Sequence, residues 1–265
     1  NITTKVNQIT ITRHNELTNE YEEMTVKGGT ISGENDKPYE TVIRGENSVK
    51  EIKAIPDNGY RVKKITVKHG SAEPTEIEFT PNDDGSVTLD KFINVREDKE
   101  VTVEFEPIQG KVIVHHYIKG TTNPVFLEDG TTAKDEEKIG YVGDPYATKR
   151  KENLAAGFIY DSVVGETSGK YIDGQKEVTY YYEALTDIDV TKNWDNTNNI
   201  YTRPDSVTIE LMANGKKVDE IVMTKENKVT IEGELENEET WQYTFVGKPK
   251  YDDSGKEIVY TVREK

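Results

Sequence analysis

One ending recurs three times along this 265-residue chain, and it limits the fold more than any other feature. The copies read KEVTVEFE from Lys99, KEVTYYYE from Lys176 and KEIVYTVRE from Lys256, so 77 and then 80 residues separate their starts. Each copy alternates and is rich in Val, Thr and Tyr, which is typical of a β-strand. A repeat at a fixed period indicates tandem structural units. We therefore predict three modules, at residues 1–107, 108–185 and 186–265. Short linkers, PIQG and ALTD, lie at the module boundaries.

Turn signals separate the alternating runs inside each predicted module. Asn-Gly, Asp-Gly and Gly-Gly pairs recur, and in this setting they indicate β-hairpins. The hydrophobic fraction is 33% and the charged fraction 32%, which suits several small domains better than one large core. One stretch, from Glu16 to Val26, carries Leu17, Tyr21 and Met24 at helical spacing and is predicted to be a helix. The expected fold class is mainly β, with three tandem small β modules.

The charge and the cysteine count exclude several classes of function. The chain has 34 Lys and Arg against 50 Asp and Glu, a net charge of −16. Such an acidic surface repels phosphate backbones and anionic lipid, so we expect no nucleic-acid partner and no binding to a membrane surface. No apolar run is long enough to cross a bilayer, so we expect no membrane insertion. There is no cysteine, which excludes disulfides and thiolate chemistry. The chain starts at Asn1 without an initiator methionine, so we take it as a piece of a longer protein.

A lysine interrupts an apolar strand face in the segment DIDVTKNW, residues 187–194. With a strand's period of two, Ile188, Val190, Lys192 and Trp194 point to one side. In the last strand, the same test puts Glu264 on the face of Ile258, Tyr260 and Val262. A buried charge is costly unless it is paired or neutralised. The pattern predicts that Lys192 and Glu264 meet, either as a plain ion pair or as a reactive pair. The alternative is that the Lys192 side chain extends past Trp194 to solvent.

The third module resembles the Cna protein B-type domain of Gram-positive surface proteins. The resemblance rests on VTKNW (190–194), RPDSVTIELMANGK (203–216), WQYTF (241–245), PKYD (249–252) and GKEIVYTVRE (255–264). It implies a reversed immunoglobulin-like sandwich of the kind that repeats in adhesin stalks. It also implies an intramolecular isopeptide bond from Lys192 to an Asn or Asp beside Glu264. That acceptor is expected beyond Lys265, so within these residues we expect an unreacted pair.

The second module, residues 110–183, resembles the MucBP (mucin-binding protein) repeat, a β-grasp-like unit. The resemblance rests on KVIVHHYIKGTTNPV (111–125), IGYVGDPYAT (139–148), GFIYDS (157–162) and KEVTYYYE (176–183). It implies Tyr117, Tyr180 and Tyr182 as a candidate face for glycan stacking, with cross-strand packing as the alternative role for these rings. The first module, from about residue 25 to 107, resembles a widespread surface-protein repeat of unassigned role.

No other constellation in the sequence predicts chemistry. His115 and His116 are adjacent, so on a strand they face opposite sides and do not chelate one metal together. The acidic loops DNTNN (195–199) and NDDG (82–85) lack the ligand spacing of an EF-hand and are interpreted as turns. No phosphate-binding loop or Ser–His–acid set is found. We expect no enzyme, no metal and no cofactor.

Together these features predict a fragment of a Gram-positive, cell-wall-attached surface protein. The leading interpretation is a structural stalk that projects a distal binding region and resists force and proteolysis. Expected partners are mucin or other host glycans or matrix proteins, and peptidoglycan through the parent chain. Two alternatives stay open: direct glycan binding by the MucBP-like unit, and accessory domains of a secreted hydrolase.

Overall fold

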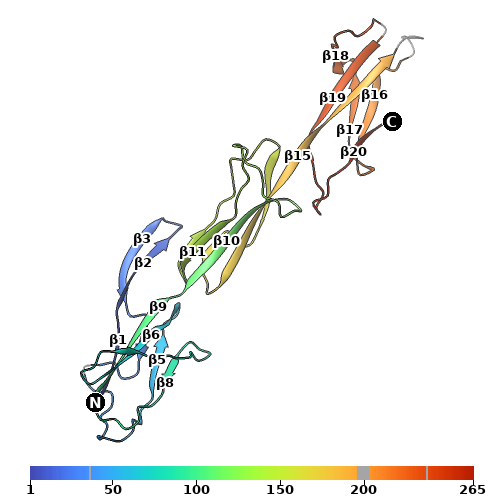
Figure 1. Cartoon of the computed structure of the whole chain (residues 1–265). Coiled ribbons are helices and arrows are strands. Elements are labelled where there is room, and N and C mark those ends of the chain that lie inside the picture. The colour runs from blue at the N-terminus through green and yellow to red at the C-terminus, as the bar shows by residue number, and fades with distance from the viewer. Residues whose placement is uncertain (36, 196–202, 237) are drawn as a thin grey trace. The chain divides into compact units, whose positions relative to one another are not determined.

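The computed structural model describes residues 1–35, 37–195, 203–236 and 238–265. Over these residues the chain forms strands β1 to β20 and one short 3₁₀ helix, η1, which confirms the expected mainly β class (Figure 1). Two compact units are present. Unit 1 comprises residues 1–114, 136–149 and 165–178, and unit 2 comprises residues 115–135, 150–164 and 179–265.

Unit 1 contains two sheets that share one hydrophobic core. The larger sheet has the order β1 (Ile2–Val6), β9 (Lys99–Pro107), β6 (Tyr60–His69) and β7 (Thr75–Glu76). The smaller sheet has the order β4 (Gly29–Ile31), β5 (Ile52–Pro56) and β8 (Val87–Leu89). Alternate residues of both sheets, including Ala54, Ile65, Val87 and Phe105, are buried against one another. We call these two sheets the first sandwich.

A separate hairpin lies between β1 and β4, where the sequence predicts a helix. β2 (Ile9–Asn15) and β3 (Glu20–Val26) pair only with each other among the described strands. The helix prediction is therefore wrong. The Asn15 side chain accepts hydrogen bonds from the backbone N–H groups of Leu17 and Thr18, which makes a turn, and Asn19 has a φ of 56°. Turn chemistry thus prevails over the helical spacing, and Leu17 and Tyr21 are exposed.

The rest of unit 1 is built around two buried tyrosines. Residues 109–114 of β10 (Gln109–Ile118) pair with β11 (Glu136–Tyr141), and β12 (Pro145–Ala147) pairs with β14 (Ser168–Lys170). The rings of Tyr146 and Tyr171 lie 5.4 Å apart, and both residues are buried. β10 and β15 (Gln175–Asp195) each contribute residues to both units.

In unit 2 the long strand β15 takes part in successive pairings. β13 (Phe158–Val164) pairs antiparallel with residues 179–184 of β15. Leu185 and Thr186 then pair with Pro249 and Lys248. The stretch ALTD, which the sequence predicts as a short linker, therefore lies inside a paired strand. The boundaries of the three modules stay a prediction.

The remaining strands of unit 2 form a second pair of sheets around one core. One sheet contains β15, β19 (Glu238–Pro249) and β18 (Lys228–Val229). The other has the order β17 (Lys216–Thr224), β16 (Ser206–Ala213) and β20 (Tyr260–Glu264), and η1 (Lys225–Asn227) follows β17. Val190, Leu211, Met223, Trp241 and Phe245 are buried together between the sheets.

Candidate functional site

Lys192 and Glu264 come together across the two sheets of this second core. Lys192 lies on β15 between Val190 and Trp194, and all three side chains are at least partly buried while Thr191 is exposed. This confirms the alternation expected for the strand. Glu264 lies on β20, in the opposite sheet, and pairs in register with Ile209. The Nζ atom of Lys192 is 2.9 Å from Oε2 of Glu264.

The surroundings of this pair are aromatic on one side and open on the other. Lys192 Nζ lies 4.5 Å from the ring centroid of Trp194, a cation–π distance. The Trp194 ring meets the Trp241 ring edge to face at 5.2 Å. The Lys192 side chain is 24% exposed, however, and that of Glu264 is 49% exposed. The sequence argument placed both charges on buried faces, and for Glu264 that is wrong, because Val262 and Glu264 lie at the exposed end of β20.

A half-exposed ion pair has limited chemistry by itself. Water screens the charges of such a pair, which limits the energy of their interaction. Forming an amide would require a neutral amine, a carboxyl or carboxamide acceptor, and an acid to move the proton. The described residues supply the lysine and the carboxylate, and they form an ion pair.

Beside this pair lies a second charged group that the sequence analysis missed. Arg203 Nη2 donates to Glu239 Oε2 at 2.9 Å, and Trp241 Nε1 donates to Glu239 Oε1 at 2.7 Å. The hydrogen bond from Trp241 and the nearby Arg203 hold the pKa of Glu239 below its usual range, although burial acts in the other direction. The signal in the sequence was the carboxylate two residues before a core tryptophan, in EETWQYTF. This set positions Trp241 against the core.

Two of the three tyrosines proposed for glycan stacking are buried. Tyr182 is 0% exposed and Tyr180 is 4% exposed. The Tyr182 hydroxyl is 2.9 Å from Nδ1 of His116 and accepts a hydrogen bond from the Lys151 backbone N–H at 2.7 Å. Because their faces pack inside unit 2, Tyr180 and Tyr182 offer no stacking surface to a glycan, and the packing role is correct for them. Tyr117 is half-buried and stacks on His115 at 5.0 Å.

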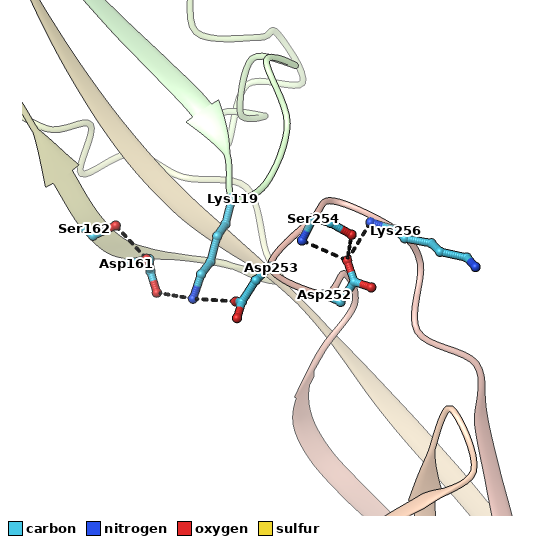
Figure 2. A network of polar contacts seen from close by, with 7 residues as sticks. All are labelled: Lys119, Asp161, Ser162, Asp252, Asp253, Ser254 and Lys256. Carbon is cyan, nitrogen blue, oxygen red and sulfur yellow. Dashed lines mark hydrogen bonds and ion pairs between the residues drawn. The ribbon is translucent and has the colours of Figure 1, made fainter.

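A polar network joins the end of β10 to the loop before β20, within unit 2 (Figure 2). Lys119 Nζ lies 3.0 Å from Asp161 Oδ1 and 3.7 Å from Asp253 Oδ1. The carboxylate of Asp161 raises the pKa of Lys119. On the other side, Asp252 accepts hydrogen bonds from the backbone N–H groups of Ser254 and Lys256, which fixes the turn that carries Asp253.

Next to this network two glycines bring the backbones into direct contact. Both Gly120 and Gly255 have positive φ, 75° and 78°. A Cβ atom on Gly120 would lie 2.4 Å from the Gly255 nitrogen, and one on Gly255 would lie 2.4 Å from the Gly120 oxygen. A backbone hydrogen bond of 2.7 Å from Lys250 N–H to Ala184 O adds a further tie. We call these contacts, with Lys119, the glycine joint. No local pattern in the sequence pairs these two glycines.

The described residues contain no group of three or more metal-ligating side chains suited to a metal ion. In the loop NDDG, Asp84 accepts from the Ser86 backbone N–H at 2.9 Å, so the carboxylate closes a turn. Most of the other acidic loop, residues 196–199, lies outside the described residues. In the part of the chain that the structure covers, no helix is long and apolar enough to span a membrane.

Comparison with known proteins supports one of the three resemblances. Residues 188–265 match the family model of the Cna protein B-type domain, which confirms that resemblance for the third module. A collagen adhesin of Staphylococcus aureus is 28% identical over 271 residues, covering 91% of this chain and 21% of the adhesin. The chain thus spans about a fifth of the length of this curated relative.

Solved structures give weaker likenesses. Two B repeat units of the collagen-binding protein of Staphylococcus aureus are 18% identical, covering 76% of this chain and 62% of that chain, with a TM-score of 0.29. A single B repeat unit is 17% identical, covering 77% of this chain and 73% of that chain, with a TM-score of 0.25. The Bacillus anthracis TIE protein is 10% identical, covering 97% and 62%, with a TM-score of 0.27.

Proposed function

We propose that this chain is part of the stalk of a bacterial cell-surface adhesin, placed outside the cell and attached to the wall through its parent protein. The observation that carries the proposal is the Cna B-type match at residues 188–265, together with similarity to a collagen adhesin over 91% of the chain. A stalk projects another region of the protein, and it needs no ligand pocket or catalytic group of its own.

The glycine joint supports this function. A connection between consecutive modules bends freely when it is an exposed, flexible linker. Here the connection lies inside the paired strand β15, and the Gly120–Gly255 contact packs the loops beside it. The described residues offer no metal-ligand cluster, and two of the three tyrosines suggested for glycan stacking, Tyr180 and Tyr182, are buried. These features favour a spacer over a binding module or an enzyme.

We also propose that Lys192 and Glu264 belong to an isopeptide-forming site. The Lys192 amine would attack the side-chain carboxamide of an Asn following Glu264, forming an amide and releasing ammonia; with an Asp acceptor, water would leave. Glu264 would relay the proton from the amine to the leaving group. Covering of Glu264 by the acceptor's segment would supply the low dielectric that is lacking at its exposed end. The proposal rests on the family match and on the 2.9 Å contact.

The isopeptide proposal is tested by intact mass. A protein extended beyond Lys265 should be lighter than its composition by one ammonia or one water, and Lys192→Ala should abolish the deficit. The bond would close a loop of about 70 residues, which by analogy with disulfides stabilises the domain by about 4 kcal/mol. An extended, folded protein at its full calculated mass would refute this proposal and leave the stalk function standing.

The stalk function is tested by replacement in the parent protein. Exchanging residues 1–265 for unrelated β domains of equal number should preserve adhesion to the parent's ligand, whereas a binding module would lose it. The isolated chain should show no saturable binding to immobilised collagen, the ligand in the relative's name, or to a mucin glycan array. Saturable binding of either ligand would overturn the stalk function in favour of a matrix- or glycan-binding role. Such a role would need a surface other than Tyr180 and Tyr182.

A further inference from the structure

We propose that the β2–β3 hairpin is an intramolecular clamp that fastens the first sandwich to the β11–β12–β14 part of unit 1. The clamp would act in the same way whether unit 1 is a spacer or a binding region. The stem of the hairpin contacts the first sandwich, and its turn contacts the β11–β12–β14 part. Apart from the hairpin contacts, the chain connects these two regions only through residues 107–109.

The stem of the hairpin is fixed to the first sandwich. The Asn7 backbone N–H donates to Val103 O at 2.9 Å, on β9. At the returning strand, Lys27 Nζ lies 3.0 Å from Glu34 Oε1, and the same carboxylate oxygen accepts from the Val6 backbone N–H at 3.0 Å. Both ends of the hairpin are therefore held where it leaves and re-enters the sandwich.

The far end of β2 binds the loop between β11 and β12 through Arg13. Arg13 Nη1 lies 2.7 Å from Oδ1 of Asp144, whose side chain is only 9% exposed. Arg13 Nη2 also donates to the Tyr60 hydroxyl at 3.2 Å. Its guanidinium carbon is 6.0 Å from the Tyr60 ring centroid and 5.9 Å from that of Tyr141. One guanidinium thus contacts the first sandwich through Tyr60 and the second region through Tyr141 and Asp144.

Glu16, in the hairpin turn, makes a second attachment that uses both carboxylate oxygens. Oε1 accepts from the Tyr171 hydroxyl at 2.6 Å, and Oε2 accepts from the Ala147 backbone N–H at 3.1 Å. Lys138 Nζ lies 3.1 Å from the same Oε2, and the Glu16 side chain is 15% exposed. The three donors come from β11, from β12 and from the residue after β14. A carboxylate with this set of donors recognises one position of the hairpin turn and no other.

Apart from these contacts, the hairpin is held by Ile11 of β2, which is 6% exposed, and by the backbone hydrogen bond from Glu16 N–H to Pro145 O at 3.3 Å. An isolated two-stranded hairpin is marginally stable in water. Residues 20–23 of β3 are exposed, and in this outer strand only Met24 and Val26 are partly buried. A second tie lies at the connection itself, where Ile108 N–H donates to Gly59 O at 2.8 Å and Val142 N–H donates to Ile108 O at 2.9 Å. The hairpin contacts and the Ile108 hydrogen bonds act at separate points. Together they restrict rotation about residues 107–109, which either set alone would leave free.

The test measures freedom between the two regions in the full chain. The chain has no cysteine, so Ser71→Cys and Lys149→Cys, both at exposed positions, give one unique pair of spin labels. We expect one narrow distance distribution in the parent and a broad one after Arg13→Ala with Glu16→Ala. Amides of residues 9–26 should exchange at least about tenfold faster in this variant, while those of β6 and β9 keep their protection.

Two controls keep the test decisive. Lys5→Ala removes an exposed ion pair inside the first sandwich and should leave the distribution narrow. Should the double variant fail to fold, Tyr171→Phe with Arg13→Gln keeps the packing, removes the charge and the hydroxyl donor, and should still broaden the distribution. A narrow distribution with unchanged hairpin protection, in whichever of these variants folds, would overturn the clamp. It would leave the stalk function intact, because that function is judged by adhesion of the parent protein.

Discussion

Replacing Gly120 with alanine is a direct test of the glycine joint. Gly120 has a φ of 75° and faces the Gly255 backbone. Gly130 provides a matched control, because its φ is 83° and a Cβ there would meet nothing within 4 Å. Both substitutions place a side chain in the left-handed region. Only Gly120→Ala also drives a methyl group into another backbone.

The expected losses of unfolding free energy follow from these two effects, the left-handed backbone and the steric overlap. Alanine in the left-handed conformation costs about 1–2 kcal/mol, which is the whole effect expected for Gly130→Ala. At Gly120 the added Cβ would lie 2.4 Å from the Gly255 nitrogen and 2.8 Å from its Cα. Backbone atoms do not move aside as a flexible side chain does, so we add about 1–3 kcal/mol for the overlap. Gly120→Ala should therefore destabilise unit 2 by about 2–5 kcal/mol.

Urea unfolding with hydrogen exchange separates the two effects. The unfolding midpoint of each variant gives the global cost, and exchange of the Lys250 amide, which donates to Ala184 O, reports the joint. We expect the Lys250 amide to exchange faster in Gly120→Ala and at the parent's rate in Gly130→Ala. Equal losses of stability in the two variants, with Lys250 equally protected, would refute the view that the backbones are in tight contact.

Four further substitutions test the core and the charges of unit 2. Trp241→Ala, at a residue 0% exposed, should cost about 3–5 kcal/mol in urea unfolding, while Val246→Ala, 71% exposed, should stay within about 0.5 kcal/mol. Lys192→Met keeps the alkyl stem and removes the charge, so in residues 1–265 it should cost less than about 1 kcal/mol; a loss above 3 kcal/mol would indicate a desolvated pair. The lowered pKa of Glu239 means that its stabilisation is complete above the ordinary glutamate pKa and is lost as the pH falls through the folded value, so Glu239→Gln should flatten the acid limb of stability against pH. An unchanged acid limb would contradict the contacts from Trp241 and Arg203.

Short-range pattern predicted the strands well, because alternation is a local property. KEVTVEFE lies in β9, KEVTYYYE lies in β15, and the end of KEIVYTVRE forms β20. The two-residue alternation along DIDVTKNW placed Lys192 beside Trp194 on the inner face of β15. Alternation does not show where along the strand the opposite sheet ceases to cover the inner face. The Glu264 end of β20 is exposed for this reason, and its burial was predicted wrongly.

The hairpin and the joints depend on contacts that no local pattern carries. Leu17, Tyr21 and Met24 fit a helix, but the Asn15 side chain caps a turn, and that preference is visible only when the residue is treated as a hydrogen-bond acceptor. Arg13 meets Asp144 across 131 positions of sequence. Gly120 and Gly255 lie similarly far apart in the chain, and each by itself is an ordinary turn glycine.

The two connections should respond differently to salt, because their ion pairs are buried to different extents. In the glycine joint Lys119 reaches Asp253, whose side chain is 97% exposed, at 3.7 Å. At 1 M salt the Debye length falls to about 3 Å, so Asp253→Asn should cost less than about 0.5 kcal/mol at low salt and nothing measurable at 1 M.

In the clamp, Asp144 is 9% exposed and Arg13 is 24% exposed. Asp144→Asn leaves the Arg13 charge poorly paired and largely out of water, so it should cost about 1–3 kcal/mol, and most of that should persist at 1 M salt. Urea unfolding of the two variants and the parent at low and high salt gives the comparison. Equal costs with equal salt dependence would mean that burial does not distinguish the two ion pairs. The expected outcome is that salt leaves both connections ordered: backbone contact between glycines maintains one, and an ion pair sheltered from solvent maintains the other.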